Sequence, residues 1–391
     1  MADAERPLVY LDHAATSWPK SEAVLDAMVR FAREGAGNPG RSGHRLAVSA
    51  GRVVSGARGA ISRLMGVGDP SRVVFGQNGT DALNLAIVGM AAGLEGRFHV
   101  VTTALEHNSV MRPLETLRRA GRVELTAVEF DAEGFVSASE VLGAVREETR
   151  LVVMSHASNV LGTVQPVEEV AAGLVGRDVL LCVDAAQTAG VVPIEMGGLG
   201  ADLLAFSGHK GLGGPTGTGV LCLSERATGR VRAVRSGGTG GDSISTVQPE
   251  GLPERLEAGT ANTIGLAGLL AAIEIVEAEG VAGRWDRERA LRDRLVAGLR
   301  GIGGVRVLGP VSSEGCVGVV SFVAEGMEAG TLAGVLDSSF GIAVRDGLHC
   351  SPGVHGALGL LPEGAVRVSV GPGTTGDEVD ALVGALSAVL G

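Results

Sequence analysis

Asp202-Leu203-Leu204-Ala205-Phe206-Ser207-Gly208-His209-Lys210 is the stretch that decides the fold and points to the chemistry. Its apolar residues are typical of a buried strand, and the strand ends in Ser-Gly-His-Lys, followed by a glycine-rich run. Lysine is rarely buried unless it is paired or chemically used. A desolvated amine can form a Schiff base with an aldehyde cofactor. Because enzymes that use pyridoxal phosphate carry such a lysine, we predict that Lys210 binds this cofactor.

A second acid strengthens this interpretation. Asp184 lies 210 − 184 = 26 residues upstream of Lys210, at the end of the apolar run Val179-Leu180-Leu181-Cys182-Val183. A carboxylate beside the pyridinium nitrogen keeps that nitrogen protonated, so that the ring can absorb electrons from the substrate. The alternative is an aspartate that only caps the following turn. Gln187, three residues further on, could hydrogen-bond the phenolic oxygen of the cofactor.

Apolar runs and helical patterns alternate on both sides of this stretch. Strands that alternate with helices of ten or more residues predict an α/β fold with a mostly parallel sheet covered on both faces. Ligands of such sheets bind beyond the carboxyl ends of the strands, where Asp184 and Lys210 are both expected. The expected strands are residues 72–75, 98–103, 123–130, 151–155, 179–184, 203–207 and 219–223, and the expected helices are residues 80–92, 109–120, 138–148 and 167–174.

The pattern changes after about residue 260. Two helices, at 264–279 and 284–300, are followed by short strands at 305–308, 317–323 and 366–370 and by a closing helix at 377–390. We therefore expect a large α/β domain with a seven-stranded sheet over residues 16–261. A smaller α+β domain, formed by residues 1–15 and 262–391, is expected to carry Cys350 and Arg367.

Residues 77–81 form a glycine-containing turn before a helical pattern, which is a suitable site for a phosphate group. In this interpretation Gly79 lies at the turn, and Thr80 caps the helix and bonds the phosphate. The alternative is simple N-capping by Thr80. Ser207 and His209, beside the lysine, are candidate phosphate donors as well.

Two polar residues follow other predicted strands. His107 could stack on the pyridine ring and shuttle protons, although a histidine in a loop is more often a surface or turn residue. Asn159 could contact the ring or the substrate.

The predicted small domain contains two further candidates. Cys350 follows a histidine in a loop flanked by glycine and proline, and it is either a reactive thiol or an inert turn residue. Arg367 lies within an otherwise apolar strand. An arginine there suggests a bidentate partner such as an amino-acid carboxylate, and a structural ion pair is the alternative.

Composition limits the class of protein. The length of 391 residues favours two domains. The net charge of 33 − 44 = −11 argues against nucleic acid or an anionic membrane surface as the main partner. No apolar run approaches the roughly 20 residues of a membrane span, and the polar N-terminus lacks a signal core, so a cytoplasmic location is the expectation. The four cysteines show no CxxC or CxxH spacing, so neither a metal site nor a disulfide framework is expected. Cys182 and Cys222 are predicted to be core residues.

Together these residues resemble the class V aminotransferases and, more closely, the cysteine desulfurase family. The resemblance runs nearly from end to end, and the order of the motifs carries it together with the Asp184–Lys210 spacing. The matching motifs are residues 10–16, 38–44, 106–108, 158–162, 184–187, 207–210, 237–240, 257–262 and 345–350, together with Thr80.

The resemblance implies a fold type I homodimer with its active site at the subunit interface. It implies that Lys210 is the Schiff-base lysine, that Cys350 accepts sulfur from L-cysteine, and that Arg367 binds the substrate carboxylate. Asn159 and His13 are further candidates for substrate contacts. The remaining cofactor contacts that it implies are Asp184 at the pyridinium nitrogen, His107 stacked on the ring, the phosphate ligands Thr80, Ser207 and His209, and Thr239 from the other subunit.

The segment 342–350 resembles the compact loop of the SufS-like branch, not the longer loop of IscS- and NifS-type enzymes. That branch usually carries Arg-x-Gly-His-His-Cys, whereas this chain has Arg345-Asp346-Gly347-Leu348-His349-Cys350, which is closer to a divergent desulfurase-like branch. A sulfur-acceptor protein of the SufU, SufE or IscU type is a candidate partner. A selenocysteine lyase, an aminotransferase or another lyase on the same scaffold, and a non-catalytic partner protein are the alternatives. Because no GxGxxG follows a strand, a nucleotide-binding Rossmann enzyme ranks last.

Overall fold

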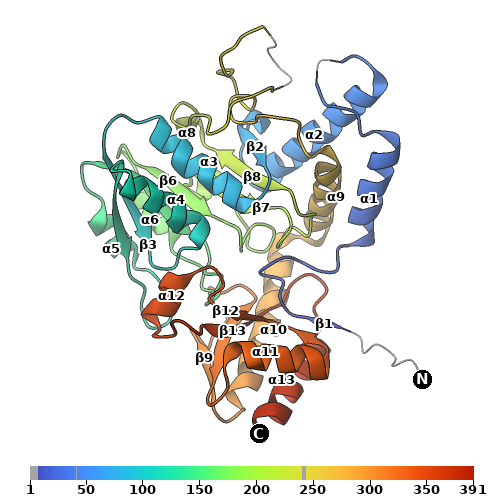
Figure 1. Cartoon of the computed structure of the whole chain (residues 1–391), viewed down its shortest axis with the longest axis vertical. Coiled ribbons are helices and arrows are strands. Elements are labelled where there is room, and N and C mark those ends of the chain that lie inside the picture. Colours follow the sequence, from blue (N-terminus) through green and yellow to red (C-terminus); the bar gives the residue numbers. More distant parts are fainter. Residues whose placement is uncertain (1–7, 41, 240–243) are drawn as a thin grey trace.

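A seven-stranded sheet forms the centre of the larger part of the molecule (Figure 1). The computed structural model describes residues 8–40, 42–239 and 244–391. The strands are β2 (Val73–Gly76), β3 (Phe98–Thr103), β4 (Val123–Val128), β5 (Thr149–Ser155), β6 (Leu180–Asp184), β7 (Leu203–Ser207) and β8 (Gly219–Leu223). Their order is β2-β8-β7-β6-β5-β3-β4, and only β8 runs antiparallel to its neighbours. The predicted α/β fold with a mostly parallel, seven-stranded sheet is confirmed.

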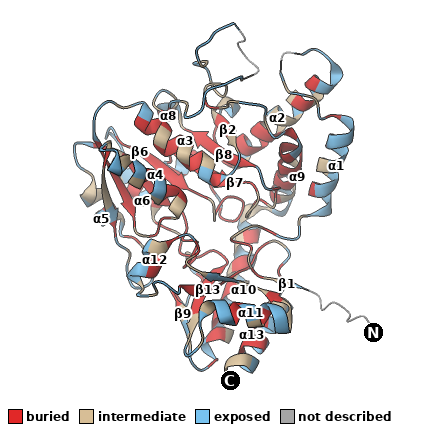
Figure 2. Ribbon diagram, in the orientation of Figure 1, coloured by how far each residue is buried: buried red, intermediate tan, exposed pale blue. Residues whose placement is uncertain are grey.

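Helices cover both faces of this sheet, because successive side chains of its strands point to opposite sides. In β6, Leu181 and Val183 belong to one apolar cluster, and Leu180 and Cys182 belong to the other. Figure 2 shows the strands as the most buried part of the molecule. On one face lie α3 (Gly79–Ala92) and α4 (Asn108–Arg119), and on the other lie α2 (Arg45–Leu64), α5 (Ala138–Ala144), α6 (Val167–Leu174), α7 (Met196–Leu199) and α9 (Thr263–Glu279). The remaining helices of this part are α1 (Glu22–Glu34), η1 (Pro70–Arg72) and α8 (Glu225–Thr228).

A smaller α+β unit lies below the large sheet in Figure 1. Its antiparallel sheet consists of β9 (Val305–Leu308), β10 (Val319–Ala324), β12 (Arg345–Gly347) and β13 (Ala365–Ser369), in the order β12-β13-β10-β9. The helices of this unit are α10 (Val281–Arg300), α11 (Ala329–Val335), η2 (Leu336–Phe340), α12 (Pro352–Ala357) and α13 (Gly376–Leu390). The N-terminal strand β1 (Val9–Tyr10) joins this unit, because it pairs in parallel with β11 (Ile342–Ala343).

The division between the two domains stays a prediction. Helix α9 lies beside α1 and α2 in Figure 1, and its Leu266 and Ile273 belong to the same apolar cluster as Ile61 of α2. This packing leads us to propose that the large domain extends through α9, to the junction of α9 and α10, beyond the predicted division at residue 262.

Two predicted elements end earlier than expected. The strand predicted at 123–130 ends at Val128, and Phe130 makes only an isolated bridge with Val136. The helix predicted at 138–148 ends at Ala144, because Val145 is already extended, with φ −76° and ψ 122°. Cys182 and Cys222 are buried, as predicted. Within the described part of the chain, no helix has both the length and the apolar character that crossing a membrane requires.

Candidate active site

The carboxyl ends of β5, β6 and β7 and the N-terminus of α3 enclose a cavity of about 270 Å³. This is the position expected for a ligand of a parallel sheet. Nine of the predicted site residues line it together: Gly79, Thr80, His107, Asn159, Asp184, Gln187, Ser207, His209 and Lys210.

Lys210 lies three residues beyond the end of β7, and its side chain is only partly exposed. Burial lowers the pKa of its amine to about 8, although the nearby Asp184 carboxylate opposes this shift. A substantial fraction of the amine is therefore neutral near physiological pH. A neutral amine is the form that attacks an aldehyde.

Asp184 is the last residue of β6 and is buried in the wall of the same cavity. Its Oδ1 accepts a hydrogen bond of 2.9 Å from the backbone N–H of Ala186. Burial raises the pKa of this carboxyl group, and the Lys210 charge partly offsets the rise. A buried carboxylate is stabilised by a cationic partner, and a protonated ring nitrogen is one. The predicted cofactor therefore fits this wall of the cavity.

The part of the cavity wall at the N-terminus of α3 suits a phosphate group. The Gly79 N–H, in the first turn of α3, donates to Ser207 Oγ over 2.9 Å, and a Cβ on Gly79 would lie only 2.8 Å from that oxygen. The prediction that Thr80 caps the helix is wrong. Asn78 is the N-cap, and Thr80 Oγ1 lies 2.7 Å from Ser109 Oγ. The hydroxyls of Thr80, Ser109 and Ser207 therefore meet a helix N-terminus, where anions bind favourably.

His107 lies on the cavity wall as the N-cap of α4. Its Nδ1 accepts a hydrogen bond of 3.0 Å from the Ser109 backbone N–H, so the neutral ring carries its proton on Nε2. Burial, assisted by the positive charge of Lys210, lowers the pKa of His107 to about 4. The imidazole is thus uncharged at neutral pH and can stack on an aromatic ring.

His209 is held at the floor of the cavity by the N-terminal segment. Its Nδ1 lies 3.0 Å from Thr16 Oγ1, and its carbonyl oxygen accepts from the Lys20 Nζ over 3.0 Å. Burial lowers the pKa of His209 to about 4 as well. It could therefore contact a phosphate as a neutral group but not as a cation.

Arg367 lies behind the cavity wall and does not line the cavity. Its Nη1 donates to the backbone oxygen of Asn159 over 3.1 Å, and its Nη2 bonds Asp12 Oδ1 at 2.7 Å. Asp12 Oδ2 also lies 4.0 Å from Arg345 Nη1. Arg367 therefore does form the ion pair considered as the alternative. Its buried Nε has no hydrogen-bond partner among the described residues, so at least this N–H is left for a further carboxylate.

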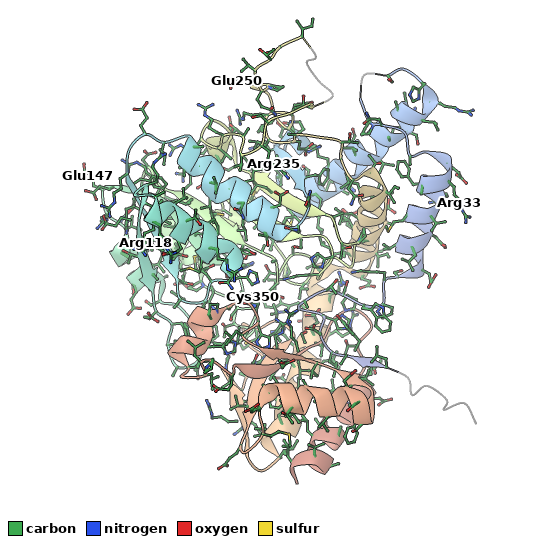
Figure 3. The ribbon with its side chains drawn as sticks, viewed as in Figure 1. Arg33, Arg118, Glu147, Arg235, Glu250 and Cys350 are labelled. Atoms are coloured by element: carbon green, nitrogen blue, oxygen red, sulfur yellow. The ribbon has the colours of Figure 1, made fainter. Side chains whose placement is uncertain are left out.

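Cys350 is the exposed cysteine of the chain, and it enters the site from the small unit (Figure 3). It lines a surface pocket of about 410 Å³ that shares Thr80, His107 and Ser109 with the cavity. The Asn108 N–H donates to the Cys350 carbonyl oxygen over 2.7 Å, which ties this segment to the start of α4. The thiol thus lies in a pocket that adjoins the lysine cavity, and we call this pocket the mouth of the cavity.

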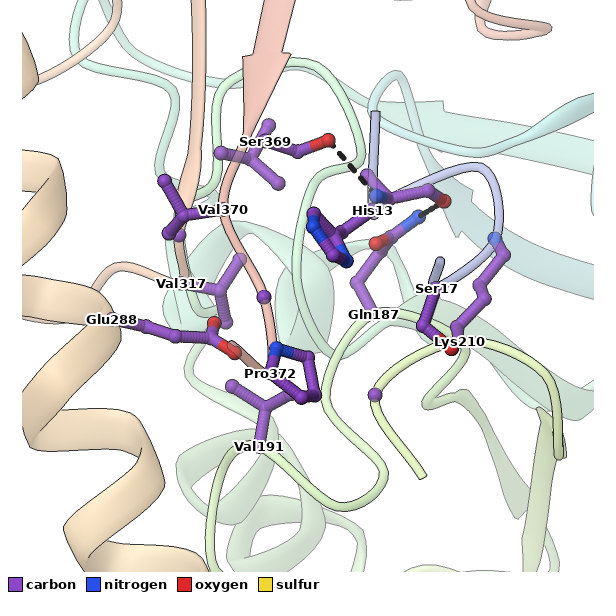
Figure 4. Close-up of a pocket in the computed structure, with 15 residues that line it drawn as sticks. His13, Ser17, Gln187, Val191, Lys210, Glu288, Val317, Ser369, Val370 and Pro372 are labelled. Atoms are coloured by element: carbon purple, nitrogen blue, oxygen red, sulfur yellow. Dashed lines mark hydrogen bonds between the residues drawn. The ribbon is translucent and has the colours of Figure 1, made fainter. Parts of the chain in front are cut away.

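Two predicted site residues lie elsewhere. His13 lines a second, smaller cavity of about 30 Å³, which shares Gln187 and Lys210 with the first and also contains Glu288 (Figure 4). Burial lowers the pKa of His13 to about 4. Thr239 lines a surface pocket of about 870 Å³ between α2 and the segment 253–261, so it does not reach the cavity of its own chain.

The sequence analysis missed three residues that complete the site. Asn78 caps α3, Ser109 bonds both Thr80 and His107, and Asp12 pairs with Arg367. A signal existed for two of them: Ser109 follows the motif at 106–108, and Asp12 lies within the motif at 10–16. The contacts of Ser109 with Thr80 and of Asp12 with Arg367 join distant segments, which spacing alone does not indicate, whereas Asn78 caps α3 locally by accepting from the Asp81 N–H.

Comparisons with known proteins identify relatives of the chain over nearly its whole length. The model of the family "Aminotransferase class-V" matches residues 9–382. A probable cysteine desulfurase of Methanothermobacter thermautotrophicus is 34% identical over 396 residues, covering 99% of this chain and 96% of the relative. A cysteine desulfurase of Cronobacter sakazakii is 32% identical, covering 97% and 93%. The apo structure of the cysteine desulfurase from Thermococcus onnurineus superposes with a TM-score of 0.90 at 32% identity, covering 98% of this chain and 94% of that one.

Proposed function

The chain belongs to the class-V aminotransferase family, and from this premise we propose that it is a pyridoxal phosphate-dependent cysteine desulfurase that converts L-cysteine to L-alanine. The observation that carries the proposal is an exposed thiol, Cys350, at the mouth of the cavity that contains Lys210. An aminotransferase needs no such thiol. The similarity to cysteine desulfurases over nearly the whole chain supports the same activity.

The residues of the cavity would hold the cofactor at three points. Lys210 would bond its aldehyde, Asp184 would hold the proton of its ring nitrogen, and the N-terminus of α3 would bind its phosphate. Pyridoxal phosphate, when bound, supplies a ring that accepts negative charge from the α-carbon of an amino acid. His107 would keep that ring flat as a neutral imidazole, because its pKa is about 4.

The reaction then depends on three side chains of this chain. Arg367 orients the substrate carboxylate. Lys210, released as a free amine, removes the Cα proton as general base. The Cys350 thiolate attacks the substrate sulfur, so that an S–S bond forms while the Cβ–S bond breaks and its electron pair stays on Cβ. Protonation of Cβ and the return of a proton to Cα give alanine, and a persulfide remains on Cys350 for transfer to an acceptor thiol.

Alanine formation tests the proposal. Purified protein loaded with pyridoxal phosphate is given L-cysteine, cysteine sulfinate or selenocysteine, with and without an added thiol. We expect alanine from cysteine in the presence of the thiol. A keto acid in place of alanine would identify an aminotransferase, and alanine from selenocysteine alone would identify a selenocysteine lyase.

The rate of cofactor binding should depend on pH. Only the neutral Lys210 amine can attack the aldehyde, so the rate at which cofactor-free protein binds pyridoxal phosphate should rise with pH, by about tenfold per unit below the pKa. The rise should level off near pH 8, because burial lowers the pKa of Lys210 to about 8. Stopped-flow absorbance measures this rate. A rate that keeps rising toward the ordinary lysine value of 10.5 would contradict a desolvated amine.

Arg367 should control substrate affinity. Arg367→Lys keeps the charge beside Asp12 but loses the planar fork that binds a carboxylate with two bonds. Loss of one charge-assisted hydrogen bond should raise the KM for cysteine by about 10- to 100-fold, with a smaller effect on kcat. Arg294→Lys is the matched control, because Arg294 forms a similar but exposed pair with Asp380. An unchanged KM in Arg367→Lys would place the carboxylate site elsewhere.

We also propose a homodimer. Exposed apolar side chains lie on α1, on α2 and at three positions of the later chain, namely Leu25, Val29, Leu46, Val48, Val234, Ile244 and Val247. Helix α2 and residues 238 and 239 line the surface pocket that contains Thr239, and Figure 1 shows α1 and α2 at one edge of the large unit. A second copy on this edge would bring Thr239 toward the partner's cavity. The acceptor protein for sulfur and the cytoplasmic location stay predictions.

A further inference from the structure

Asn159 contacts the segment that carries Cys350 through both atoms of its side-chain amide. Its Nδ2 donates to the carbonyl oxygen of His349 over 2.7 Å, and its Oδ1 accepts from the Ser351 hydroxyl over 2.7 Å. These two partners come directly before and directly after Cys350. A carbonyl can only accept, so the NH₂ group must face His349 and the amide oxygen must face Ser351. The orientation of the Asn159 side chain is thereby fixed.

All three residues of this network are shielded from water. Asn159 is 7% exposed, His349 is 5% exposed and Ser351 is 0% exposed. Water therefore cannot replace a lost hydrogen bond, and a buried polar group left without a partner costs about 1–3 kcal/mol. The two bonds thus tie the segment more firmly than the same bonds would at the surface.

The backbone of the segment needs such ties. His349 has φ 50° and Cys350 has φ 58°, and within residues 8–40, 42–239 and 244–391 these are the non-glycine residues with positive φ. The left-handed region is unfavourable for residues with a Cβ atom, by roughly 1–2 kcal/mol each. Two consecutive residues in this region persist only when surrounding contacts enforce them. The bonds from Asn159, together with the Asn108 N–H bonded to the Cys350 oxygen, are such contacts.

Asn159 also belongs to the cavity and to the substrate-binding side. It lines the wall of the cavity with Lys210, and its backbone oxygen accepts from Arg367 Nη1 over 3.1 Å. One residue therefore contacts the arginine expected to bind the carboxylate and the segment that carries the thiol.

We propose that the two hydrogen bonds from the Asn159 side chain, one with His349 and one with Ser351, form a latch. This latch fixes the Cys350 thiol at the mouth of the cavity. Ser351 is then a positioning residue for the sulfur step: it touches neither cofactor nor substrate, but it holds the segment from which the thiol attacks. The expected effect on kcat rests on the proposed function, whereas the latch itself can be detected by hydrogen exchange, which needs no activity.

Ser351→Ala in the holoenzyme tests the latch. Ser338→Ala is the control, because it also removes a hydroxyl that donates to a carbonyl oxygen, that of Gly334, but at an exposed site. Hydrogen exchange of the peptide spanning 345–352 should become about tenfold faster, which corresponds to the loss of one hydrogen bond. The kcat for alanine formation should fall by about the same factor, with the KM for cysteine and the cofactor absorbance unchanged. Ser338→Ala should match the wild type in each measurement.

The outcomes separate the latch from the proposed function. Unchanged exchange in Ser351→Ala overturns the latch, and faster exchange with an unchanged kcat overturns its role in the sulfur step. If Ser351→Ala does not fold, Asn159→Asp removes the bond to His349 with little change in size, and the same faster exchange is expected. If the wild type forms no alanine from cysteine, the proposed function fails, while the exchange result still decides whether the latch exists.

Discussion

Lys210→Ala should yield a colourless protein. The alanine side chain has no amine to bond the aldehyde, so pyridoxal phosphate should be lost on dialysis together with its visible absorbance. Without the general base, alanine formation from cysteine should fall by about 10³-fold or more. An absorbance spectrum recorded after loading and dialysis measures the first effect, and a steady-state assay measures the second.

Lys20→Ala is the matched control for this prediction. Lys20 is also partly buried near the cavity, where its Nζ bonds the carbonyl oxygen of His209, and burial lowers its pKa to about 8 as well. It is therefore the rival amine. The Lys20→Ala variant should keep the absorbance. If Lys20→Ala lost the absorbance while Lys210→Ala kept it, the cofactor bond would have to be assigned to Lys20.

Cys350→Ser should separate cofactor binding from sulfur chemistry. The hydroxyl of serine is not ionised near neutral pH, so it cannot replace a thiolate as the nucleophile. We expect an unchanged cofactor absorbance and a fall in alanine formation from cysteine of about 10³-fold or more, the order observed when a catalytic nucleophile is removed. The measurement is alanine and sulfide release under steady-state conditions.

Cys316→Ala serves as the control for the cysteine variant, because Cys316 is buried and its thiol donates a hydrogen bond to the Ser312 carbonyl oxygen. It should keep the activity. Full activity in Cys350→Ser would assign Cys350 to the structure, or would indicate a selenocysteine lyase or sulfinate chemistry, which can proceed without the thiol.

The large sheet could be predicted from the sequence because its strands are buried on both faces. They read as short continuous apolar runs, and all seven were placed within two residues of their observed ends. Helices α1 and α2 were not predicted. Both helices are amphipathic, but they precede residue 72, where the alternation of strands and helices that indicated the fold begins.

The position of the cavity could be predicted because ligands of parallel sheets generally bind at the carboxyl ends of the strands. Strands that run in parallel bring their carboxyl ends to one edge, so the sequence pattern is enough to place Asp184 and Lys210 together. The contacts that refine the site could not be predicted. Asp12 and Arg367 are 355 residues apart in the chain, and Asn159 and Ser351 are 192 apart. Such pairs depend on how the small unit packs against the large sheet.

The central claim is that the amine of Lys210 bonds the aldehyde of pyridoxal phosphate. Loaded wild-type protein is reduced with borohydride, digested, and analysed by mass spectrometry for a peptide that carries the reduced cofactor. The account predicts the modification on the side chain of Lys210 and its absence from the Lys210→Ala variant. A modification on Lys20 or another residue, or none in a protein loaded to saturation, would contradict it.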